Sequence, residues 1–118
     1  MKNPKVTPNL RNCVLATSEA KDLEIYKQAD YEVKIFKCHS ELLKVATQCR
    51  TDILKTISKH GPESLYELAK LVQKNQAYIY RETKILEKLG LVDFIKAESG
   101  GRKRVRPQNR YAQIVIHL

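Results

Sequence analysis

Residues 64–90 read SLYELAKLVQKNQAYIYRETKILEKLG and contain two apolar patterns of helical spacing, separated by the polar residues 73–76. Ser64 and Glu67 match the capping box that begins a helix, and Gly90 favours the end of one. Two helices joined by a short polar turn predict a helix-turn-helix. The inward positions are predicted to be Leu65, Leu68, Ala69 and Val72 in the first helix and Ile79, Thr83, Leu86 and Leu89 in the second.

A further helical pattern precedes this pair. Ser40 is predicted to cap one turn of helix, and Thr47 is predicted to cap the longer helix that follows. Gly61 and Pro62 predict the end of that helix. The apolar positions with helical spacing are Leu42, Leu43 and Val45 in the turn and Cys49, Ile53, Leu54 and Ile57 in the helix.

The pattern changes to β-structure after the helix pair. Residues 91–97 and 102–107 flank Gly100 and Gly101, a pair able to adopt the positive φ angles of a two-residue hairpin turn. This hairpin would form a wing beside the helices. Residues 112–118 then alternate apolar with other side chains, which predicts a third strand with one face inward.

The N-terminal part is less regular. Residues 1–17 hold two prolines and no sustained period, which predicts an irregular arm. From Ser18, apolar residues recur at helical spacing and predict a short helix over residues 18–29. Residues 31–35 alternate apolar and charged side chains, as a half-buried strand does.

Residues 36–118 resemble the winged helix-turn-helix of small prokaryotic transcriptional regulators of the MarR/ArsR-like group, which includes antitoxin-type DNA-binding proteins. The chain departs from that pattern at Gln73, where a small residue is common, and at Thr83, where an aliphatic residue is usual. The matching residues are Phe36, Leu42, Leu43, Thr47, Arg50, Ile53, Leu54, Gly61, Pro62, Ser64, Glu67, Leu68, Ala69, Arg81, Leu86, Glu87, Lys88, Leu89, Gly90, Leu91, Val92, Ile114, Ile116 and Leu118.

The expected fold is therefore α+β. A winged helix-turn-helix, with a three-helix core plus a β-hairpin wing, would occupy residues 38–118 as the DNA-binding domain. Residues 1–37 would form an N-terminal helix/strand extension for dimerisation or partner binding.

The second helix of the pair is the candidate reader of DNA. Its N-terminal part would approach base edges, where Gln76 suits adenine and Arg81 suits guanine, while Lys84 suits phosphate. The candidate DNA-binding residues here are Lys74, Gln76, Ala77, Tyr78, Tyr80, Arg81 and Lys84. The alternative is a solvated polar face on which Tyr78 and Tyr80 are partly buried rim residues.

The hairpin adds a stripe of arginines. With Gly100 and Gly101 in the turn, alternation places Arg102, Arg104 and Arg106 on one face, and Glu98 opposite Lys103. Such a stripe suits phosphate contact or insertion into a narrow minor groove. The alternative is a charged edge strand that prevents aggregation.

Charge favours a polyanionic partner. The chain has 22 Lys and Arg residues against 13 Asp and Glu residues, a net charge of +9 and a pI near 9.6. Residues 91–118 hold six of these basic residues and two of the acidic ones, so the C-terminal quarter is the most basic part. The alternative is that the charge serves only solubility.

Other protein classes find little support. A length of 118 residues predicts one small domain rather than a large enzyme, and no phosphate loop, nucleophile elbow or metal-ligand spacing occurs. The longest uncharged stretch, residues 111–118, is too short to span a membrane, and the N-terminus lacks an apolar signal region. We expect a cytoplasmic protein with no enzyme activity, metal or cofactor. The three cysteines, predicted to be thiols, are Cys13, Cys38 and Cys49, and the histidines are His39, His60 and His117.

The sequence thus predicts a sequence-specific double-stranded DNA-binding transcriptional regulator, a dimeric repressor that occludes a promoter. A dimer would read two half-sites, with residues 18–38 as its interface unless they fold back on their own chain. One rival is an antitoxin that binds its toxin through residues 1–37 and autoregulates its promoter. Another is a winged helix that serves only as a protein-interaction scaffold, although the basic wing argues against it.

Overall fold

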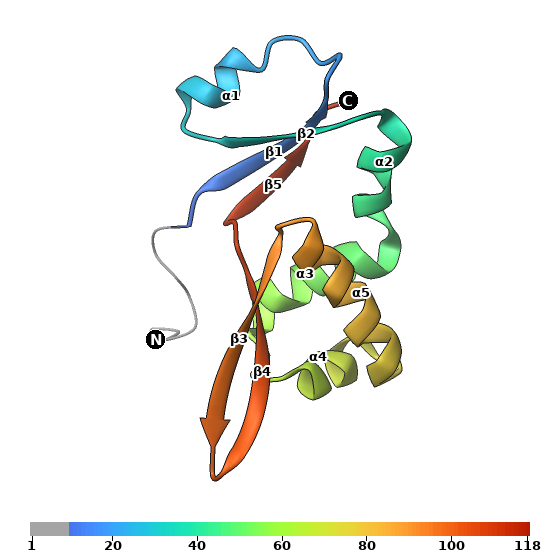
Figure 1. Cartoon of the computed structure of the whole chain (residues 1–118), viewed down its shortest axis with the longest axis vertical. Coiled ribbons are helices and arrows are strands. Elements are labelled where there is room, and N and C mark those ends of the chain that lie inside the picture. The colour runs from blue at the N-terminus through green and yellow to red at the C-terminus, as the bar shows by residue number, and fades with distance from the viewer. Residues whose placement is uncertain (1–9) are drawn as a thin grey trace. The chain divides into compact units, whose positions relative to one another are not determined.

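The computed structural model describes residues 10–118, with the side chains of Ala97, Ser99, Arg102 and Lys103 excepted. Within these residues the chain has an α+β fold with five α-helices and two small sheets (Figure 1). It forms two units, which we call the helix–hairpin unit, Gln48–Arg110, and the sheet unit, residues 10–47 with Tyr111–Leu118. This division lies later in the chain than the expected boundary at residues 37–38, and it joins the C-terminal residues to the N-terminal ones.

Three helices form the core of the helix–hairpin unit: α3 (Gln48–His60), α4 (Leu65–Val72) and α5 (Gln76–Lys88). They match the predicted helices, and α3 starts directly after Thr47. The buried side chains are those that helical spacing placed inward: Ile53, Ile57, Leu65, Leu68, Ala69, Ile79, Thr83 and Leu86. Cys49 and Leu54 of α3 are half-buried.

The turn between α4 and α5 is fixed by local hydrogen bonds. Gln73 ends α4 in the left-handed conformation with φ 60°, and the amides of Gln73 and Lys74 donate to the carbonyls of Lys70 and Ala69. Asn75 caps α5, because its Oδ1 accepts hydrogen bonds from two amides of the first turn. The unusual Gln73 is therefore accommodated by a C-terminal capping motif.

The cap of α4 and the inward threonine of α5 both make hydrogen bonds close by in the chain. The Ser64 hydroxyl accepts the amide of Glu67 at 3.0 Å, as predicted, but the Glu67 carboxylate accepts from the amide of Glu63 instead of returning to Ser64. Thr83 lies fully buried, and its hydroxyl donates to the carbonyl of Ile79 at 2.7 Å. The inward polar side chain is thus satisfied within its own helix.

Strands β3 (Val92–Ser99) and β4 (Arg102–Asn109) form the predicted hairpin. Gly100 and Gly101 have φ angles of 60° and 80°, the combination that a two-residue turn of this kind requires. The register pairs Glu98 with Lys103, as predicted, and Phe94 with Pro107. Pro107 is buried and the Phe94 ring lies 6.3 Å from the Tyr80 ring of α5, so this face packs toward the helices.

The sheet unit contains a parallel sheet of order β2-β1-β5. Its strands are β1 (Asn12–Thr17), β2 (Glu32–Phe36) and β5 (Gln113–Ile116), and its helices are α1 (Glu24–Gln28), α2 (His39–Leu43) and the short 3-10 helix η1 (Lys44–Ala46). The central strand β1 provides the core, because Cys13, Val14, Leu15 and Ala16 are completely buried.

The structure corrects the prediction of an irregular arm over residues 12–17. These residues form the central strand of a parallel sheet, which is covered on both faces and therefore shows no alternation of apolar and polar side chains. Residues 1–9 of the predicted arm lie outside the described residues.

Other expectations about this unit are partly corrected. The N-terminal helix is short, because Asp22 has a φ of 64° and α1 begins only at Glu24, so Ser18 caps nothing. Cys38, not Ser40, precedes α2 in the extended cap position. The last predicted strand forms as β5 (Gln113–Ile116), and it pairs with β1 of the sheet unit.

Candidate nucleic-acid interface

The N-terminal turns of α5 present an exposed polar face. Gln76, Ala77 and Arg81 are exposed, as is 46% of Tyr80, while Ile79, Thr83 and Leu86 on the opposite side are buried. The Asn75 cap orients this first turn, and Lys74 is exposed in the connection before it. These positions agree with the predicted outward face.

The face borders two adjoining hollows, which together we call the α4–α5 groove. One, of about 620 Å³, is lined by Leu65, Asn75, Gln76, Ala77, Tyr80 and Arg81. The other, of about 900 Å³, is lined by Ser64, Leu65, Tyr66, Glu67, Lys70, Leu71, Gln76, Arg104 and Val105. Gln76 lines both hollows, so the groove brings the start of α5 together with α4 and the hairpin strand β4.

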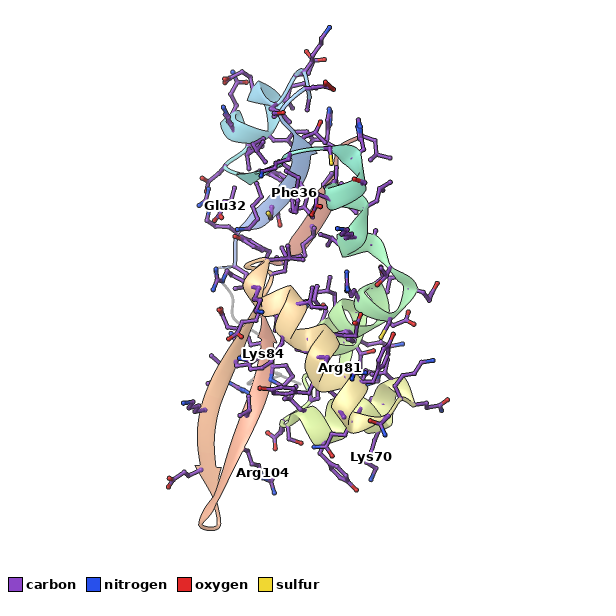
Figure 2. All side chains as sticks on the ribbon, turned by 45° about the vertical axis from the view of Figure 1, so that its right-hand side comes forward. Glu32, Phe36, Lys70, Arg81, Lys84 and Arg104 are labelled. Carbon is purple, nitrogen blue, oxygen red and sulfur yellow. The ribbon has the colours of Figure 1, made fainter. Side chains whose placement is uncertain are left out.

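The groove has an excess of positive charge. Lys70 on α4, Arg81 on α5 and Arg104 on β4 contribute cations (Figure 2). Glu67 contributes a carboxylate to the larger hollow. Over the described part of the chain, no carboxylate lies within 4.0 Å of the charged groups of these three cations. Their charges are therefore available to an anionic ligand.

Sequence reasoning missed Tyr66 and Lys70. Tyr66 is 58% exposed, and the Lys70 ammonium lies 5.3 Å from the centre of its ring. The two residues are four apart on the side of α4 opposite its buried positions. A tyrosine and a lysine four residues apart on the outward face of a predicted helix could have indicated this part of the groove from the sequence.

Lys84 lines neither hollow of the α4–α5 groove. Its ammonium lies 2.9 Å from the Glu87 carboxylate and 5.0 Å from the centre of the Phe94 ring on β3. The hydrogen bond with Glu87 raises the pKa of Lys84. Lys84 thus packs between α5 and the hairpin and is less available to phosphate than Arg81.

Tyr78 is also engaged within the protein. It is half-buried, and a hydrogen bond with the Cys49 thiol of α3 raises the pKa of its phenol. The guanidinium carbon of Arg81 lies 5.9 Å from the centre of the Tyr78 ring. Tyr78 is therefore a partly buried residue that lies beside the Arg81 guanidinium, whereas Tyr80 is exposed.

The arginines of β4 separate into different environments. The register places Arg102, Arg104 and Arg106 opposite Ser99, Ala97 and Ile95, so the three occupy alternate positions as predicted. Arg104 is exposed and lines the groove, whereas Arg106 is half-buried with one Nη 3.4 Å from Gln108 Oε1. Only the backbone of Arg102 is described.

Two contacts fix the elements beneath the groove. Arg50 of α3 and Glu82 of α5 form an ion pair at 3.0 Å, with about 15% of each side chain exposed. Asn109 of β4 donates from Nδ2 to the Leu54 carbonyl of α3 at 3.0 Å. Both α5 and the hairpin are thereby attached to the same helix.

The described residues give no sign of a metal site, because no group of three His, Cys, Asp or Glu side chains converges among them. The three cysteines are unbridged. Each helix from residue 10 onward is too short or too polar to cross a bilayer.

Comparison with known proteins gives one family. The HVO_A0114 family model matches residues 45–116, which include all of the helix–hairpin unit and strand β5. Comparison with curated proteins gives no match. Because the matched region covers more than half of the 118 residues, the chain belongs to the HVO_A0114 family.

Proposed function

We propose that the helix–hairpin unit is a winged helix-turn-helix that binds double-stranded DNA. Three helices followed by an antiparallel hairpin support this assignment, and α4 and α5 are joined by a turn of only three residues, Gln73 to Asn75. The observation that carries the function is the α4–α5 groove, which is lined by Lys70 and Arg104 in one hollow and by Arg81 in the other, all three without carboxylate partners in the described chain.

In this proposal the first turns of α5 enter the major groove. Gln76 and Arg81 then face base edges, because an amide pairs with adenine and a guanidinium with guanine through two hydrogen bonds. Lys70 on α4 and Arg104 on β4 line the same hollow as Gln76, and in this proposal they contact the phosphates beside the major groove. The exposed Tyr80 ring offers apolar contact to a thymine methyl group.

The biological role that fits is transcriptional regulation in the cytoplasm by occlusion of a promoter, without enzyme activity, as the resemblance to MarR/ArsR-like regulators implies. The antitoxin alternative stays a prediction. It requires the same DNA-binding surface and adds a protein partner for the N-terminal segment.

A salt series tests the proposal. Selection from a random duplex library, followed by fluorescence anisotropy on the selected site, should show log K falling linearly with log salt, by about 0.9 per neutralised phosphate. A matched single strand of the same sequence is the control. A salt-independent affinity, or equal affinity for the single strand, contradicts binding to duplex DNA.

A further inference from the structure

The sheet unit has an open edge at β2. The strand order β2-β1-β5 leaves one side of β2 without a neighbouring strand among the described residues. Figure 2 marks the two ends of this strand, Glu32 and Phe36. Ile35, within the strand, is 53% exposed. A strand edge with an exposed branched side chain is a template for pairing with another strand.

The backbone groups that face this edge belong to Val33 and Ile35. The Phe36 carbonyl accepts the amide of Ser18, which follows β1, so the polar groups of Phe36 point toward β1. Successive residues of a strand direct these groups to opposite edges, so those of Val33 and Ile35 point outward.

Helix α1 makes an aromatic contact on the far side of β1 from this edge. Its Tyr26 ring lies 5.7 Å from the ring of His117, which follows β5 on the far side of β1. Helix α1 therefore extends at least one side chain across the sheet, while the strand order leaves the edge of β2 without a neighbouring strand among the described residues. Another strand therefore has room to approach β2 laterally.

Charge decides the register in which two copies of β2 fit together. When two copies of one strand pair antiparallel about a two-fold axis perpendicular to the sheet, one residue lies opposite its own copy, and we call that residue the centre of the pair. The axis keeps each side chain on the same face of the sheet, so residues on either side of the centre face each other in matched pairs. Centring on Lys34 places the two lysines opposite each other. Centring on Val33 places each Glu32 opposite the Lys34 of the other copy, and each Ile35 opposite Tyr31.

We propose that two copies of this chain pair antiparallel through β2, centred on Val33, to form one continuous six-stranded sheet. The outward amide and carbonyl groups of the two Val33 residues then bond to each other. Two Glu–Lys pairs and two aromatic–branched pairs, both favourable across strands, flank the centre. Within one chain the Lys34 ammonium lies 3.4 Å from the Glu32 carboxylate, so in the dimer each carboxylate would be shared by the lysines of both copies. The inference is independent of DNA binding, because it uses only the sheet unit.

Charge exchange tests this register in the full chain. By sedimentation velocity the wild type should be dimeric at micromolar concentration, and Lys34→Glu should weaken the dimer by about tenfold, since it opposes two pairs of carboxylates. The double variant Glu32→Lys/Lys34→Glu should restore dimerisation, because it re-forms the pairs between the chains along with the pair within each chain; the Val33→Cys cross-link separates these two contributions. Circular dichroism confirms that each variant is folded, and Tyr111→Phe controls for the loss of the Glu32–Tyr111 hydrogen bond.

Cross-linking tests the centre directly, and it does not depend on charge. In a Cys38→Ser background, Val33→Cys should form a disulfide-linked dimer on mild oxidation, because the two Cα atoms would lie about 5.5 Å apart. Lys34→Cys should not cross-link, because the register separates its two copies by about 8 Å. A monomeric wild type, a dimer that tolerates Lys34→Glu, or efficient cross-linking only through Lys34→Cys overturns the proposal.

Discussion

Arg81 and Arg104 line the α4–α5 groove from different elements, and their surroundings differ. Arg81 lies over the Tyr78 ring near the start of α5, which restricts where its guanidinium points. Arg104 is exposed on the hairpin, and among the described residues its side chain makes no ring contact or ion pair. A constrained guanidinium suits recognition of a base, and a mobile one suits contact with a phosphate.

Replacing each arginine should therefore give a different phenotype. Arg81→Ala should cost about 1–3 kcal/mol of binding free energy and relax specificity at one base pair. Arg104→Ala should weaken binding to all sequences and reduce the salt slope by about one contact. Anisotropy on the selected site and on single-base variants measures both effects.

Lys88→Ala is the matched control, because Lys88 is exposed at the far end of α5 and lines neither hollow of the groove. If Arg81→Ala and Arg104→Ala bound DNA as tightly as the wild type and Lys88→Ala do, the groove would not be the DNA-binding surface, although the fold would be unaffected.

Glu32 makes the stability of the sheet unit depend on pH. The Tyr111 hydroxyl donates to its carboxylate at 2.6 Å, and this hydrogen bond, with Lys34 and Arg11 nearby, lowers the pKa of Glu32. The folded state therefore favours the ionised carboxylate of Glu32. This preference stabilises the folded state above pH 4.5, the ordinary pKa of a glutamate, and the stabilisation is lost as the pH falls through the lower pKa that Glu32 has in the folded protein. Tyr111→Phe should flatten this dependence in urea titrations between pH 3 and 7. An unchanged pH profile would show that the hydrogen bond contributes nothing.

At the scale of elements, the turn between α4 and α5 contains a strained residue. Gln73 holds a left-handed conformation that is unfavourable for any residue with a Cβ atom. Gln73→Gly should raise the free energy of unfolding by up to about 1 kcal/mol in chemical denaturation. Lys74→Gly is the comparison, because Lys74 does not have a positive φ, and it should lower stability. A loss of stability in Gln73→Gly would contradict the assigned conformation.

Elements with one buried face were predictable, whereas those defined by distant partners were not. Periodicity located α3, α4 and α5, and Gly100-Gly101 located the hairpin, because each shows its pattern within a short window. Strand β1 shows no alternation because both its faces are covered, although the apolar run Val14–Leu15–Ala16 is typical of a parallel strand. No local pattern specified that β5 would pair with residues 12–15.

The residues of the candidate site also divide into those predictable from one helix and those that depend on packing between elements. Helical projection predicted an outward face with Ala77, Arg81, Lys84 and Lys88 and with Tyr80 beside them, and of these Ala77, Tyr80, Arg81 and Lys88 are exposed. The engagement of Lys84 with Phe94 and of Tyr78 with Cys49 depends on packing between elements, which spacing along one helix does not specify.

At the scale of the whole molecule, the two units should respond differently to DNA. Hydrogen exchange should be slowest in β1, whose side chains are buried at the centre of its sheet, and fast at the hairpin tip, Gly100 and Gly101. Adding the selected duplex should slow exchange in residues 76–81 and in β4 while leaving β1 unchanged. Protection confined to β1 and β2 would place the DNA on the other unit.

The order of the strands along the chain has a consequence for synthesis. Strand β1 is translated before β5, which covers one of its edges and follows the entire Gln48–Arg110 segment. A nascent chain that stalls before residue 113 therefore exposes an apolar strand edge that the finished protein hides. Interrupted translation would leave fragments that chaperones and proteases can distinguish from the completed protein by that edge alone.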